Sequence, residues 1–145
     1  MIGLLQRVTQ ACVTVENRTV AKINSGLLVL IGVEKDDTEK QADRLFERLL
    51  GYRVFPDADD KMNLSLRDIN GDLLLVPQFT LPADTRKGMR PSFSTAAPPE
   101  TGKRLFDYLV KIAGKQHHSI ETGIFGADMK ITLTNDGPVT FWLQT

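Results

Sequence analysis

The chain has 145 residues, which is enough for one domain with an ordinary buried core. Its 18 lysines and arginines balance 18 aspartates and glutamates, so no overall charge attracts nucleic acid or a membrane surface, and any nucleic-acid contact must be local. The single cysteine, Cys12, excludes an internal disulfide framework and indicates a reducing compartment. No apolar run is long enough to cross a bilayer, and the first residues lack a signal-peptide pattern, so we expect a cytoplasmic protein.

The first third of the sequence predicts β-strands. Short runs rich in branched residues are separated by turn residues such as Asn17-Arg18 and Asn24-Ser25-Gly26. Residues 27–31 are apolar throughout, which is typical of a central strand with both faces buried. The predicted strands are 4–8, 12–16, 20–23 and 27–33.

Two amphipathic helices are predicted. The first follows Thr38, which forms a capping-box pattern with Gln41, and it ends at Gly51. The second begins at Pro98-Pro99-Glu100 and ends near Gly114. Each helix carries its apolar residues on one face, so both are expected to pack on the sheet.

Further strands are predicted in the rest of the chain, at 52–55, 63–69, 72–80, 124–134 and 139–144. Asn70-Gly71 is a strong signal for a β-hairpin, and residues 82–99 read as a long ordered loop. The sum is one α+β domain over residues 1–145, with a mainly antiparallel, barrel-like sheet and two packed helices.

The sequence offers few side chains for conventional hydrolytic chemistry. His117 and His118 are the only histidines, and neither a Ser/His/Asp set nor metal-ligand spacing can be assembled with them. The aspartates of residues 56–60 do not have the spacing of a calcium loop. We therefore expect no metal and no cofactor, and any chemistry must come from backbone groups, hydroxyls or the substrate.

Two short segments stand at the ends of predicted strands. Gln78-Phe79-Thr80 either turns its N–H groups and hydroxyl toward a substrate carbonyl or is a plain turn, and Thr80 has no adjacent base that would make it a nucleophile. Asn135-Asp136-Gly137-Pro138 fits a hairpin loop, although Pro138 lacks the N–H that a strand start would use.

A basic cluster lies in the long loop, close to Phe93. Arg86, Lys87 and Arg90 either contact phosphate or a stacked base, or they form an ordinary solvated loop.

Together these segments resemble the D-aminoacyl-tRNA deacylase family, enzymes that strip D-amino acids from tRNA. Several separate motifs occur in the family's order along the whole chain. They are residues 5–8, 26–33, 61–64, 78–81, 90–93 and 135–141.

The resemblance implies hydrolysis of D-aminoacyl-tRNA, and of glycyl-tRNA, by a homodimer with two active sites at the subunit interface. It assigns Gln78, Phe79 and Thr80 to the substrate-cradling catalytic motif. It implies that Gly137-Pro138 is cis, enters the partner's pocket and rejects L-esters. The chemistry is expected to rely on the terminal ribose hydroxyl of the tRNA, and the expected partners are aminoacyl-tRNA and a second subunit, with neither DNA nor membrane.

One position departs from the family pattern. The family usually has serine before Gln-Phe-Thr, whereas this chain has Pro77, which provides neither an N–H nor a hydroxyl. Two other functions therefore stay open: a tRNA-binding module with reduced or lost activity, and a Thr80-dependent amidase acting on small substrates.

Overall fold

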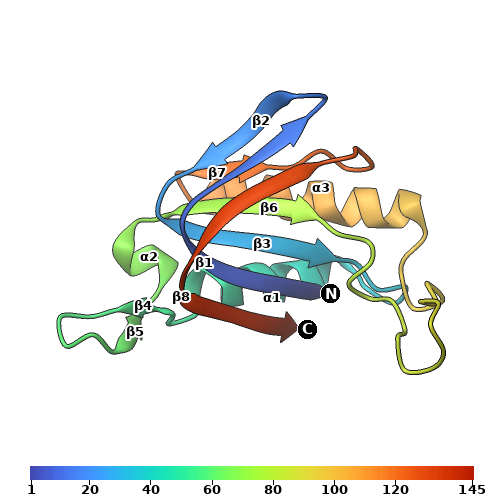
Figure 1. Cartoon of the computed structure of the whole chain (residues 1–145). Helices are drawn as coiled ribbons and strands as arrows, with labels where there is room; N and C mark the ends of the chain where they lie inside the picture. Colours follow the sequence, from blue (N-terminus) through green and yellow to red (C-terminus); the bar gives the residue numbers. More distant parts are fainter.

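A computed structural model describes all of residues 1–145 (Figure 1). A strongly curved sheet has the strand order β2-β1-β3-β6-β7, and β8 also pairs with β1. A separate two-stranded sheet is formed by β4 and β5. The strands are β1 (Ile2–Val15), β2 (Arg18–Ile23), β3 (Gly26–Gly32), β4 (Phe55–Pro56), β5 (Met62–Leu64), β6 (Asp72–Pro77), β7 (Ile120–Thr122) and β8 (Lys130–Gln144). The helices are α1 (Glu39–Gly51), α2 (Leu66–Ile69) and α3 (Pro99–Gln116).

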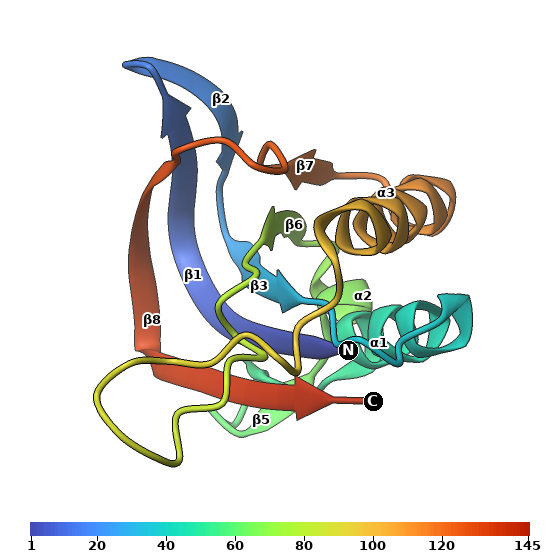
Figure 2. The ribbon, with the colours of Figure 1, turned by 90° about the vertical axis from the view of Figure 1, so that its right-hand side faces the viewer.

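The curvature of the sheet follows from its longest strand. β1 pairs with β3 over its first half, with β2 over its second half, and with β8 along most of its length, always antiparallel. The sheet therefore bends into a nearly closed shape, with α1 and α3 side by side on one face (Figure 2). The predicted fold class is confirmed, and the structure adds two parallel pairs, β3 with β6 and β6 with β7.

β3 is the central strand, as predicted, because both of its faces are buried. Leu27 and Val29 belong to the larger apolar cluster, which contains the inner faces of α1 and α3. Leu28 belongs to a second cluster on the other face of the sheet, with Val8 and Val76. Burying alternate residues on opposite sides explains why this run is apolar throughout.

Both predicted amphipathic helices are present. At the start of α1 the Gln41 Oε1 atom accepts hydrogen bonds from the Thr38 N–H at 3.0 Å and from the Thr38 hydroxyl at 2.6 Å. α3 begins at Pro99, where a proline is tolerated because the first N–H groups of a helix have no partner. None of the helices is long and apolar enough to cross a membrane.

The predicted hairpin around Asn70-Gly71 is wrong. Ser65 caps α2, because its Oγ accepts from the Asp68 N–H while the Asp68 carboxylate accepts from the Ser65 N–H at 2.7 Å. These hydrogen bonds, led by that of the Ser65 side chain, hold the pKa of Asp68 below its usual value. Asn70 adopts a left-handed conformation with φ of 53° and ends α2, so Asn70-Gly71 closes a helix rather than a hairpin.

Other predicted strands also differ from the structure: 4–8 and 12–16 are one strand, β1, and of 52–55 only Phe55 is in a strand. The strand expected at 72–80 ends at Pro77, and residues 78–82 form turns. Residues 124–129 are not a strand, while β7 at residues 120–122 was not predicted. β8 runs without interruption from Lys130 to Gln144, so residues 135–138 are an irregularity inside one strand and not a hairpin loop.

Candidate functional site

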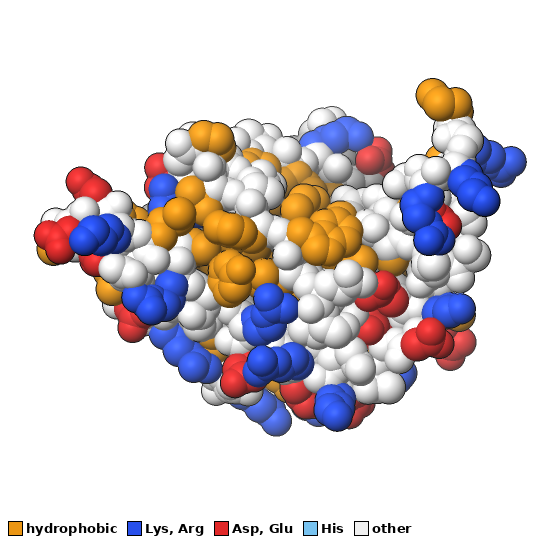
Figure 3. All heavy atoms as spheres, turned by 90° about the horizontal axis from the view of Figure 1, so that it is seen from below, with side chains coloured by type: hydrophobic (Ala, Val, Ile, Leu, Met, Phe, Trp, Pro, Cys, Tyr) orange, Lys and Arg blue, Asp and Glu red, His pale blue; other side chains and the backbone are white.

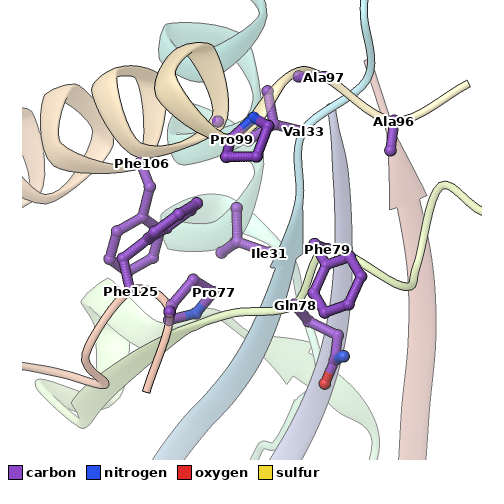
Figure 4. A pocket seen from close by; sticks show the side chains of 12 residues that line it. Ile31, Val33, Pro77, Gln78, Phe79, Ala96, Ala97, Pro99, Phe106 and Phe125 are labelled. Carbon is purple, nitrogen blue, oxygen red and sulfur yellow. The ribbon is translucent and has the colours of Figure 1, made fainter. Parts of the chain in front are cut away.

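An apolar pocket of about 290 Å³ opens where the parallel strands β3 and β6 end, below the start of α3 (Figure 4). The strand ends are joined, because the Gln78 N–H donates to the Ile31 carbonyl at 2.7 Å. The carboxyl ends of parallel strands are a common place for ligand crevices. The lining residues are Ile31, Val33, Pro77, Gln78, Phe79, Ala96, Ala97, Pro99, Gly102, Phe106, Phe125 and Gly126.

Aromatic and aliphatic side chains form the inner wall of this pocket. The rings of Phe106 and Phe125 lie together at the α3 side, facing Ile31 and Pro77 (Figure 4). The side chain of Gln78 stands at the mouth and points away from these rings. The pocket therefore suits a flat, mainly apolar group with its polar end near Gln78.

The predicted motif Gln78-Phe79-Thr80 forms the turn at the pocket mouth. Gln78 Nε2 donates to Thr80 Oγ1 at 2.6 Å, and the carbonyls of Gln78 and Thr80 accept from the Leu81 and Ala83 N–H groups at 3.3 and 3.2 Å. The Thr80 hydroxyl thus faces an amide donor, which cannot remove its proton. This geometry gives Thr80 a polar contact but no activation as a nucleophile.

Phe79 is the exposed residue of this turn. Its side chain is 65% exposed, and its ring lies 5.4 Å from that of Phe93, measured between centroids. Phe93 is exposed as well, so the two rings form a small exposed apolar patch beside the pocket.

The basic loop divides into two parts. Asp84 and Ser92 are joined by two backbone hydrogen bonds of 2.8 and 3.0 Å, and Arg86 forms a two-pronged ion pair with Asp84 at 2.9 and 2.7 Å. The Arg86 side-chain hydrogen bonds lower the pKa of Asp84 strongly. Lys87 and Arg90 are exposed and form no ion pair, so they are the charges left for an external anion.

Gly137 and Pro138 lie in a bulge of β8, and neither residue lines the pocket of its own chain. Their peptide bond is cis, and Gly137 has φ of 128°, a conformation open to glycine. Both residues are exposed. The structure thus brings Gln78, Phe79 and Thr80 together at the pocket but leaves Gly137-Pro138 on another part of the surface.

Several residues of this region were not singled out from the sequence. Phe125 and Gly126 follow the short strand β7, which carries no clear pattern, so no sequence signal pointed to them. Arg7 had a visible signal, because it is the one charged residue in the strand predicted at 4–8. In the structure its guanidinium contacts Asp136, next to the Gly137-Pro138 bulge.

The remaining candidates have structural contacts. His117 Nε2 lies 2.7 Å from the Gly71 carbonyl oxygen, and its ring packs on that of His118. Cys12 is half-buried in β1, opposite Lys22 of β2. No group of three or more His, Cys, Asp or Glu side chains is placed to hold a metal ion.

Comparison with known proteins shows which family this chain belongs to. The family model described as D-Tyr-tRNA(Tyr) deacylase matches residues 4–144. A protein named D-aminoacyl-tRNA deacylase from Escherichia coli O81 (strain ED1a) is 58% identical over 144 residues, covering 99% of both chains. One of the same name from Pseudomonas fluorescens (strain Pf0-1) is 60% identical over 145 residues, covering all of both. The chain belongs to the D-Tyr-tRNA(Tyr) deacylase family.

Two solved structures have the same fold. One, named c-Myc DNA Unwinding Element Binding Protein, is 35% identical, with a TM-score of 0.96 over 100% of this chain and 99% of that one. The other is described as a probable eukaryotic D-amino acid tRNA deacylase. It is 19% identical, with a TM-score of 0.84 over 99% of this chain and 98% of that one, and it supports the fold alone.

Proposed function

We propose that this protein hydrolyses the ester bond of D-aminoacyl-tRNA, releasing free tRNA and the D-amino acid. The observation that carries the proposal is the turn Gln78-Phe79-Thr80 at the mouth of an apolar pocket, in a chain whose family match covers residues 4–144. Amide and hydroxyl groups at the mouth suit a polar ester, and the apolar interior suits an adjoining ring.

The pocket fits the terminal nucleobase of a tRNA. Its volume of about 290 Å³ and its wall of Phe106, Phe125 and Ile31 suit one planar ring system that is held by stacking and apolar contact. Gly102 and Gly126 also line the pocket, and neither has a side chain that would narrow it. With the base inside, the ester on the terminal ribose would lie at the mouth, near Gln78 and Thr80.

The catalytic step is proposed to be assisted by the RNA. Thr80 receives a hydrogen bond from the Gln78 amide rather than giving its proton to a base. The terminal ribose hydroxyl next to the ester is then the group best placed to help water attack the carbonyl. The protein contributes orientation and polarisation of the ester, which are large terms in catalysis by themselves.

Stereochemical selection is proposed to come from Gly137-Pro138 of a second subunit. The segment is exposed and lies outside the pocket of its own chain, and the open ring of Phe79 leaves apolar surface for a partner to cover. A rigid wall placed against the Cα atom would exclude an L-substituent while accepting D-aminoacyl and glycyl esters. A monomer at micromolar concentration in sedimentation velocity would contradict this arrangement.

Pro77 favours one alternative, a tRNA-binding module with reduced activity. It lines the pocket and pairs with Ile31 in the sheet, yet it offers no N–H or hydroxyl to a substrate. The test is deacylation of D-tyrosyl-tRNA by the natural protein and by the Pro77→Ser variant. If the natural protein and the Pro77→Ser variant both hydrolyse the ester, the natural protein is an active deacylase. If only the Pro77→Ser variant does, the natural protein is a tRNA-binding module with reduced or lost activity.

A further inference from the structure

The Gly137-Pro138 bulge is held by hydrogen bonds made by the side chain of Asn135. Across the β1–β8 ladder, Asn135 faces Val8 and Thr140 faces Gln6, so the four residues 136–139 of β8 stand opposite the single residue Arg7 of β1. Extra residues of this kind lose regular pairing and need other contacts to hold their shape.

Asn135 supplies such contacts on the far side of the bulge. Its Oδ1 accepts from the Val139 N–H at 2.7 Å, and its Nδ2 donates to Thr140 Oγ1 at 2.9 Å. One short side chain therefore reaches from the residue before the bulge to the two residues after it. Asn135 is half-buried, whereas Gly137 and Pro138 are exposed, so the residue that holds the bulge is less exposed than the two residues it holds.

The two contacts use both functions of the amide. Its oxygen accepts from the Val139 N–H, and its NH₂ group donates to Thr140 Oγ1. Alanine would remove both contacts. Aspartate would keep the acceptor and could still contact Thr140, because the threonine hydroxyl can donate to a carboxylate.

Arg7 holds the same bulge from the opposite end. Its Nε donates to the Asp136 carbonyl at 3.1 Å, directly before Gly137. Gly137-Pro138 is thus fixed on one side by Arg7 and on the other by Asn135, and its position relative to the sheet depends on both.

We propose that Asn135 is a positioning residue for stereochemical selection, which fixes the distance of the Gly137-Pro138 wall from the substrate Cα. The inference rests on the proposed function of this wall. A wall that excludes one enantiomer must be held to within a fraction of a bond length, and misplacement by about 1 Å can cost roughly 100-fold in rate. Loss of Asn135 should therefore impair selection more than binding.

The test compares Asn135→Ala, Asn135→Asp and the natural protein on D- and L-tyrosyl-tRNA. For the alanine variant we expect kcat/KM on the D-ester to fall roughly 10- to 100-fold, mainly through kcat, and the D-to-L ratio to fall with it. The aspartate variant should recover most of the ratio. An unchanged ratio in the alanine variant overturns the proposal.

Asn63→Ala provides the matched control. Asn63 also holds a loop through its side chain, donating to Asp57 Oδ2 at 2.6 Å and accepting from Arg53 Nη2 at 2.6 Å, but it does not line the pocket. This variant should lose stability without changing the D-to-L ratio. An equal loss of selectivity in both variants would reduce Asn135 to a general structural role and overturn the proposal.

Hydrogen exchange separates this inference from the proposed function. If the natural protein does not cleave D-tyrosyl-tRNA, the proposed deacylase function is wrong, but the role of Asn135 in holding the bulge is still open to test. The positioning of the bulge is then judged by the Val139 amide, which should exchange faster in Asn135→Ala while the Leu143 amide keeps its protection. Unchanged exchange at Val139 would show that Asn135 does not hold the bulge.

Discussion

Arg7 and Asp136 are joined twice, because the Arg7 Nε atom lies 3.1 Å from both the backbone carbonyl and the carboxylate of Asp136. The same guanidinium donates to the carbonyl of the buried residue Val54 at 2.7 Å, and the Arg7 side chain is only 11% exposed. The bulge that carries Gly137 is therefore tied to the interior of its own chain. Figure 3 shows the face of the molecule seen from below, where hydrophobic side chains gather near the middle with lysine and arginine side chains beside them.

Replacing Arg7 by alanine should destabilise the protein, because it leaves the Val54 carbonyl buried without this partner. We expect a loss of roughly 2–3 kcal/mol in the free energy of unfolding, measured with urea. Arg7→Lys should recover little, since an ammonium does not reproduce the planar fork. Arg44→Ala is the control: Arg44 pairs with Glu47 on the surface at 2.5 Å and should change stability by less than about 0.5 kcal/mol. Equal effects of the two alanine variants would contradict this account.

Gly32 should not tolerate a side chain. A Cβ atom there would lie 2.8 Å from both Leu81 Cβ and Pro82 Cδ, which belong to the turn that closes the pocket mouth. Gly32→Ala is expected to cost about 1–3 kcal/mol of unfolding free energy. Gly114→Ala, with nothing within 4 Å of its Cβ, should instead stabilise α3 by about 0.5–1 kcal/mol. If Gly32→Ala left the unfolding free energy unchanged, the turn at Leu81 and Pro82 would be able to shift away from the added methyl group, and the prediction would be wrong.

Thr80→Ala should keep substantial deacylase activity, because the hydroxyl contacts an amide and no base. A D-aminoacyl-tRNA that lacks the terminal 2′-hydroxyl should lose much of its reactivity with the natural protein. Single-turnover kinetics on both substrates measures the two effects. Complete inactivity of the alanine variant would restore Thr80 as a nucleophile, and full cleavage of the modified tRNA would exclude RNA assistance.

The basic loop should contribute to tRNA affinity through Lys87 and Arg90. If each meets a phosphate, Lys87→Gln and Arg90→Gln should each reduce the salt dependence of binding by about one unit of slope. Arg86→Gln should change the slope less, since Arg86 is already paired with Asp84. The measurement is the affinity of the natural protein and of each variant for tRNA at a series of salt concentrations from low to moderate. A slope unaffected by all three changes would leave the loop as a solvated surface.

The parts of the fold that the sequence predicted are those governed by local chemistry. Thr38 and Gln41 begin α1, the prolines before Glu100 begin α3, and the apolar run 27–31 forms the central strand. The two parallel strand pairs depend on long-range packing and leave no local pattern.

The hairpin error has a local cause. Asn-Gly suits both a two-residue hairpin and a left-handed helix end, and the capping pair Ser65 and Asp68 decided for the helix. In the site, Gln78-Phe79-Thr80 could be found from the sequence, but the contact of Arg7 with Asp136 could not, because 129 residues separate the two partners.

The central claim is tested most directly by hydrolysis of matched esters. The natural protein is incubated at one concentration with D-tyrosyl-, L-tyrosyl- and glycyl-tRNA, and the remaining ester is followed over time. The account predicts rapid loss of the D-tyrosyl and glycyl esters, while the L-tyrosyl ester decays at its spontaneous rate. Equal hydrolysis of the D- and L-esters, or hydrolysis of neither, would contradict it.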